Sequence, residues 1–112
     1  MKGWAILMAK EKNKLVSSKV KFNFPKMDGI TEVNLAGTFN NWNENINPLK
    51  QNKNGSWSLV LGLNPGKYEY KYKTNLGWFT DPKAEGYINN SFGDQNSLIE
   101  VKDSSRAYPY YV

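Results

Sequence analysis

Runs in which apolar and polar residues alternate recur along the chain, and this pattern is typical of β-strands. In the first run, Val20, Phe22 and Phe24 alternate with polar residues as far as Pro25. Further runs cover residues 32–37, 56–61, 67–73 and 98–101. Each has about the usual length of a strand with one face turned inward. No segment sustains a 3.6-residue period, so we expect an all-β fold of five to eight strands.

Turn residues separate these runs at spacings that suit an antiparallel sandwich or barrel. Asn54-Gly55 predicts a two-residue hairpin loop, because both residue types tolerate positive φ. Pro65-Gly66 fits the central pair of a type II turn. Asp28-Gly29 and Asp81-Pro82 are further breaks between elements.

The length of 112 residues fits a single domain that can bury a core without covalent staples. We divide the chain into a basic N-terminal segment, residues 1–16, a sandwich, residues 17–102, and an aromatic C-terminal tail, residues 103–112. The first segment either forms a short helical turn or is frayed. The tail, which contains Tyr108-Pro109-Tyr110-Tyr111, either docks on a partner or folds back on the sheet.

The net charge of +5 is concentrated in one segment. Residues 10–26 hold six lysines and one acid, whereas the rest of the chain holds nine basic and nine acidic residues. This distribution favours a solvated tail and edge strand over a nucleic-acid-binding face. The apolar run Trp4 to Ala9 is too short for a signal peptide, and no run approaches a membrane span. We therefore expect a cytoplasmic protein with no nucleic acid or membrane as its partner.

The chain contains no cysteine and no histidine. This excludes a disulfide framework and thiolate metal sites, and it removes the commonest general base and metal ligand. The carboxylates are scattered through turns and strand faces without a motif, whereas a retaining glycosidase needs two of them close together in a cleft. We expect no enzyme activity, no cofactor and no metal.

Aromatic residues are abundant, with four Trp, seven Tyr and five Phe. Trp57 is in phase with Leu59 and Leu61, which indicates a core position. Tyr68, Tyr70 and Tyr72 share one face of one strand, which we interpret as inward. The opposite face of that strand then displays Glu69, Lys71 and Lys73.

Two tryptophans do not fit the core pattern. Trp42 lies in the asparagine-rich connection Asn40 to Asn43, and Trp78 follows a hairpin-like loop, Asn75 to Gly77. Such residues either cap the ends of the sandwich or form a binding surface, since binding residues concentrate on loops held by a rigid sheet.

A binding surface of this composition suits a neutral sugar polymer. A flat indole face matches the C–H patches of a sugar ring, and stacking of this kind contributes roughly 1–3 kcal/mol per ring. Asparagine offers both donors and acceptors to hydroxyls, and the chain has fifteen asparagines.

Three stretches together carry a family resemblance: Val33 to Trp42 (VNLAGTFNNW), Leu63 to Tyr72 (LNPGKYEYKY) and Gly77 to Pro82 (GWFTDP). They resemble the glycogen-binding domain of AMP-activated protein kinase β subunits and the related N-terminal domains of isoamylases and branching enzymes, carbohydrate-binding module family 48. The resemblance covers roughly residues 17–102. It implies an immunoglobulin-like β-sandwich that binds α-1,4-glucan, such as glycogen, starch or maltodextrin, without catalysis.

The resemblance also implies a set of site residues. The two stacking tryptophans of the family match Trp42 and Trp78, its sugar-binding lysine matches Lys71 and its binding asparagine matches Asn96. Phe92 stands where the kinase subunits have a leucine that contacts the glucan. Asp94 departs from the pattern, because the kinase domains have a small hydroxyl residue there.

Two other functions stay open at this stage. The chain could be a protein-interaction or scaffolding module that targets or organises a glucan-active enzyme or a kinase complex, in which case Trp42→Ala would leave partner binding intact. Single-stranded nucleic-acid binding is a second rival, because small β-barrels combine aromatic residues with positive charge for that purpose. A steep salt dependence of binding would favour nucleic acid, whereas sugar binding should be nearly independent of salt.

Overall fold

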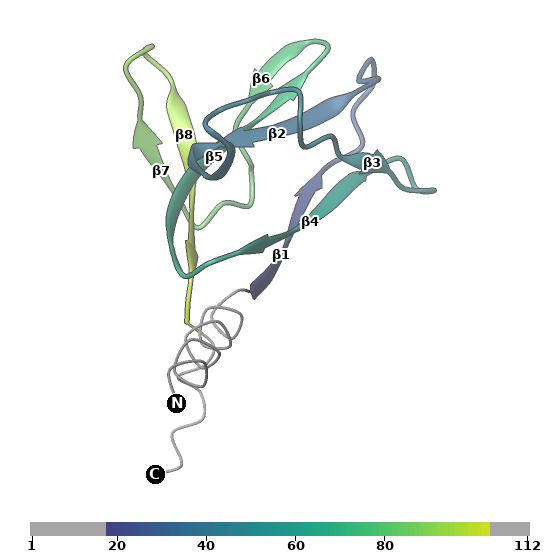
Figure 1. Ribbon diagram of the computed structural model, residues 1–112. Coiled ribbons are helices and arrows are strands. Elements are labelled where there is room, and N and C mark those ends of the chain that lie inside the picture. Colours follow the sequence, from purple (N-terminus) through teal and green to yellow (C-terminus); the bar gives the residue numbers. More distant parts are fainter. Residues whose placement is uncertain (1–17, 104–112) are drawn as a thin grey trace, which may run out of the picture.

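A computed structural model describes residues 18–103. The fold consists of two antiparallel sheets packed as a sandwich in one compact domain (Figure 1). In chain order the elements are β1 (Ser18–Phe24), β2 (Val33–Gly37), the 3-10 helix η1 (Thr38–Asn40), β3 (Lys50–Gln51), β4 (Trp57–Leu63), β5 (Gly66–Thr74), β6 (Gly77–Phe79), β7 (Gly86–Asn89) and β8 (Gln95–Val101). The expected all-β sandwich is confirmed. The expectations for residues 1–16, and for all but the first residue of 103–112, lie outside the described residues.

One sheet has the strand order β1-β4-β3, and the other has the order β2-β5-β8-β7 with β6 also paired to β5. The nine-residue strand β5 is the centre of the second sheet, since it pairs with β2, β6 and β8. A strand paired on both sides holds its side chains in a fixed register. The outer face of β5 is therefore a rigid platform.

The core follows the alternation of the sequence. Phe22 and Phe24 of β1 face inward and meet Tyr70 and Tyr72 of β5 edge to face, with ring centroids 5.1 Å and 5.3 Å apart. Trp57 lies opposite Phe24 in the β1–β4 register and is 7% exposed, so its expected core position is confirmed. Edge-to-face aromatic pairs add to the free energy gained by burying the rings.

The two buried tyrosines share one polar partner. Tyr70 and Tyr72 donate their hydroxyl hydrogen bonds to Oδ2 of Asp81, at 2.7 Å and 3.3 Å. Burial, aided by the Asp81 carboxylate, raises the pKa of both tyrosines far above the usual range. The Asp81 carboxylate thus has a structural role, satisfying hydroxyls that the core would otherwise leave unpaired.

Two turn predictions are wrong in detail. The β3–β4 loop spans residues 52–56 and is closed by a hydrogen bond from the Asn52 amide to the Ser56 carbonyl, and of Asn54 and Gly55 only Gly55 has positive φ, 92°. Gly66 has φ 156° and begins β5, so it does not hold the φ of about 80° that a type II turn requires. At this point the chain passes from β4 in one sheet to β5 in the other, so Gly66 takes a conformation that suits this connection and not a tight turn.

Candidate functional site

The outer face of the second sheet gathers side chains from three strands. Lys71 alternates with the inward tyrosines of β5 and points away from the core, and Lys73 lies opposite Trp78 in the β5–β6 register. On β8, Ser97 lies opposite Tyr70 and is fully buried, so its neighbour Asn96 faces outward. Trp78 follows the turn at residues 75–76, and Gly77–Phe79 pair back on β5 as a short strand, so Trp78 is held by a sheet rather than by a loop.

Trp42 reaches the same face from an unusual backbone. Asn41 and Trp42 have φ of 56° and 58°, in the left-handed region that a bulky residue such as Trp rarely adopts. The Asn40 side chain stabilises this turn. Its Oδ1 accepts from the Gly37 amide at 3.0 Å, and its Nδ2 donates to the Leu35 carbonyl and to Asn47 Oδ1. These bonds fix the strained turn that aims the indole over the sheet.

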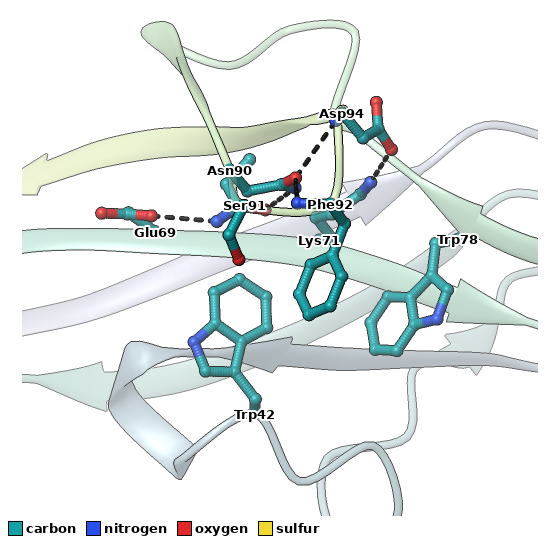
Figure 2. Close-up of a pocket in the computed structure, with 9 residues that line it drawn as sticks. Trp42, Glu69, Lys71, Trp78, Asn90, Ser91, Phe92 and Asp94 are labelled. Carbon is teal, nitrogen blue, oxygen red and sulfur yellow. Dashed lines mark hydrogen bonds and ion pairs between the residues drawn. The ribbon is translucent and has the colours of Figure 1, made fainter.

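The loop between β7 and β8 is organised by Asn90. Its Oδ1 accepts from the amides of Phe92 and Asp94, at 2.9 Å and 3.1 Å, and its Nδ2 donates to Asn96 Oδ1 at 3.0 Å. The loop leaves Phe92 with 91% of its surface exposed. Figure 2 shows the ring of Phe92 projecting from this loop toward the indoles of Trp42 and Trp78.

These side chains enclose one groove of about 700 Å³. It is lined by Trp42, Glu69, Lys71, Trp78, Asn90, Ser91, Phe92, Asp94 and Asn96 (Figure 2). The structure thus brings together all five residues named from the sequence. Neither groove tryptophan is sunk in the core, since Trp78 is 40% exposed and Trp42 is half-buried. That these residues bind sugar stays a prediction.

Lys71 differs from its expected display on an open face. It points away from the core, but it is only 6% exposed, because the β7–β8 loop covers it. Its ammonium forms a short ion pair with Oδ2 of Asp94, whose side chain is 60% exposed. The hydrogen bond from Lys71 holds the pKa of the Asp94 carboxyl below its usual range. An ammonium has three N–H groups, so two are left to donate after this pair.

Asn96 is also held in place rather than free on the surface. It is 8% exposed, donates through Nδ2 to Glu69 Oε1 at 2.9 Å, and accepts from Asn90. The amide therefore has a fixed orientation and keeps one N–H for a ligand.

Sequence reasoning missed four residues of the groove as site residues: Glu69, Asn90, Ser91 and Asp94. Glu69 lies two positions before Lys71 on the same strand face, and that spacing could have identified it. The loop residues had no such signal.

The groove offers aromatic rings beside fixed polar groups, an arrangement that suits a neutral ligand rich in hydroxyls. Within residues 18–103, no Asp, Glu, His and Cys side chains gather in the number needed to hold a metal ion. The described part of the chain also has no helix long and apolar enough to cross a membrane.

Comparison with known proteins identifies the family of this chain. Residues 18–107 match the family model described as the glycogen recognition site of AMP-activated protein kinase. The chain is 36% identical over 77 residues to 5'-AMP-activated protein kinase subunit beta-2 of Mus musculus and of Homo sapiens, a match covering 69% of this chain and 27% of each relative. It is 35% identical over 74 residues to subunit beta-1 of Sus scrofa, covering 66% of this chain and 57% of that protein.

The chain thus corresponds to only about a quarter of the beta-2 subunits that it matches. The matched family is a glycogen-binding module without catalytic activity. On the strength of the family match, which spans most of the sequence and the whole described sandwich, the chain belongs to the glycogen-binding domains of AMP-activated protein kinase β subunits, within carbohydrate-binding module family 48.

Proposed function

We propose that the groove binds α-1,4-glucan chains, such as glycogen, starch or maltodextrin, through the side chains of Trp42, Lys71, Trp78, Phe92 and Asn96. The observation that carries this proposal is the convergence of all five on one groove, from three strands and two loops.

In the proposed mode, consecutive glucose units lie against the indoles of Trp42 and Trp78. Phe92, almost fully exposed, presses on a ring from the opposite loop. Lys71 and Asn96 donate to sugar hydroxyls with the N–H groups that their partners in the protein leave over. Two stacked rings and a few hydrogen bonds, less the cost of ordering the chain, give a Kd of roughly 1 µM to 1 mM.

Calorimetric titration with maltoheptaose tests this mode, with a cello-oligosaccharide as the control ligand. The double variant Trp42→Ala/Trp78→Ala should lose all measurable binding while keeping the thermal stability of a folded domain. Leu76→Ala is the matched control, because it removes an exposed apolar side chain outside the groove lining and should bind normally. Undiminished maltoheptaose binding by the double variant would reject the proposal.

A second function, tethering a protein partner, is favoured by the names of the matched relatives, which are subunits of a kinase. In this proposal the domain targets a kinase subunit or a glucan-active enzyme to the glucan, and residues 17–102 form the binding unit. Affinity capture of a kinase subunit with wild-type and Trp42→Ala protein separates the two roles. Capture that survives Trp42→Ala, while glucan binding is lost, would assign separate surfaces to them. The cytoplasmic location expected from the sequence stays a prediction.

A further inference from the structure

Among the described residues, the one cation of the groove lining already forms an ion pair with a carboxylate. Of the nine lining residues, Lys71 is the positive one and Glu69 and Asp94 are the negative ones, so their formal sum at pH 7 is −1. The Lys71 ammonium is already joined to Asp94. Glu69 accepts from the neutral amide of Asn96, and no cation within residues 18–103 forms an ion pair with it.

Beyond the lining, the ammonium of Lys73 lies 5.3 Å from the centroid of the Trp78 ring. Its ammonium is 4.0 Å from Glu44 Oε1. Counting this pair as well gives two lysines against three carboxylates, so the sum is still −1. Lys71 and Lys73 therefore each form an ion pair with a carboxylate of the described chain.

We infer that the groove selects uncharged α-glucan over glucan that carries phosphate esters, and that Asp94 is the residue that sets this selectivity. The inference rests on the proposed function. A phosphate monoester carries a charge of about −1.5 to −2 at pH 7. In this groove it meets a net negative charge, and it has to compete with Asp94 for the Lys71 ammonium. A neutral hydroxyl meets no such penalty and can donate to the carboxylates.

Asp94 is placed to exert this effect. Its side chain is 60% exposed at the edge of the groove, where its Oδ2 holds the Lys71 ammonium. The lowered pKa keeps the carboxylate charged throughout the neutral range. Replacing it by asparagine releases the ammonium and brings the charge of the lining from −1 to zero.

The test compares maltoheptaose with maltoheptaose carrying one 6-phosphate, by titration in about 20 mM salt. Wild-type protein should bind the neutral ligand at least tenfold more tightly. Asp94→Asn should shrink that ratio by about tenfold, equivalent to about 1.4 kcal/mol. Glu32→Gln, which removes the same charge from an exposed position outside the lining, should leave the ratio unchanged.

A salt series on wild-type protein provides a second measurement that needs no variant. In 1 M salt the Debye length falls to about 3 Å, so charge-based rejection of the phosphate should fade. A preference that does not change with salt would be steric, and it would overturn the inference. Equal binding of both ligands by wild type, or an unchanged ratio in a folded Asp94→Asn variant, would also overturn it while the proposed function stands. Failure of wild type to bind maltoheptaose would reject the proposed function itself.

Discussion

Asn90 shows how much of the groove depends on single amide side chains. It bonds to the backbone of its own loop and to the side chain of Asn96, so it couples the loop carrying Phe92 and Asp94 to strand β8. Asn90 therefore positions Phe92, Asp94 and Asn96, and its removal should displace these groove residues.

We predict that Asn90→Ala weakens maltoheptaose binding by about tenfold, since three hydrogen bonds of roughly 1 kcal/mol each no longer hold the loop. Titration calorimetry measures the effect. Asn89→Ala is the matched control, because Asn89 is exposed, outside the groove lining, and should bind normally when changed. Equal affinities of the two variants would contradict the positioning role of Asn90.

The three tryptophans that the structure describes separate into a core residue, Trp57, and two groove residues, Trp42 and Trp78. Trp57→Ala should lower the free energy of unfolding by about 3–5 kcal/mol, because it empties a buried site between the sheets. Trp42→Ala should lower it by less than about 1 kcal/mol, since Trp42 lies outside the core cluster. Urea unfolding followed by circular dichroism measures both changes. A larger loss for Trp42→Ala than for Trp57→Ala would mean that Trp42 supports the fold.

At the scale of elements, strand β5 decides where the groove lies. Its inner face supplies the tyrosines of the core, and its outer face supplies Glu69 and Lys71. The junction of β2 and η1 then brings Trp42 over this face. Gly37 makes the junction close, since a Cβ there would lie 2.5 Å from the Glu69 carbonyl oxygen and 2.8 Å from the Phe39 ring.

Gly37→Ala should therefore destabilise the domain by about 1–3 kcal/mol and weaken glucan binding, as the Trp42 turn is pushed away from β5. Gly86→Ala is the control of the same chemistry, because its added Cβ would meet Leu98 at an ordinary 3.7 Å. Thermal unfolding and maltoheptaose titration of both variants test this prediction. If the Gly37→Ala protein were as stable as Gly86→Ala, the junction of β2 and η1 would accommodate the added Cβ without cost, and the prediction would be wrong.

At the scale of the whole molecule, the two sheets enclose two tyrosine hydroxyls, and their burial makes the free energy of unfolding depend on pH in the alkaline range. Tyr70 and Tyr72 are buried and share the Asp81 carboxylate, and their pKa values are raised. Above the unfolded pKa of about 10, the unfolded chain releases their protons while the folded chain retains them. The stabilisation is complete below that pH and is lost as the pH rises beyond it.

We expect the free energy of unfolding to fall above pH 10 by up to about 1.4 kcal/mol per pH unit for each of the two tyrosines. Urea unfolding between pH 8 and pH 11.5 measures this slope. Lysines also titrate in this range, so Tyr70→Phe, which should have a shallower slope, isolates the tyrosine effect. Identical slopes for wild type and Tyr70→Phe would contradict the account.

The alternation of the sequence was enough to predict the sandwich, the inward aromatic faces and a core position for Trp57, because side-chain direction along a strand follows from local geometry. It was also enough to set Trp42 and Trp78 apart from the core. The covering of Lys71, by contrast, depends on Asp94, 23 residues away, and the orientation of Asn96 depends on Glu69, 27 residues away. Such contacts are fixed only when the sheet brings distant segments together, so the tertiary structure alone decided the charge of the groove and the order of its polar groups.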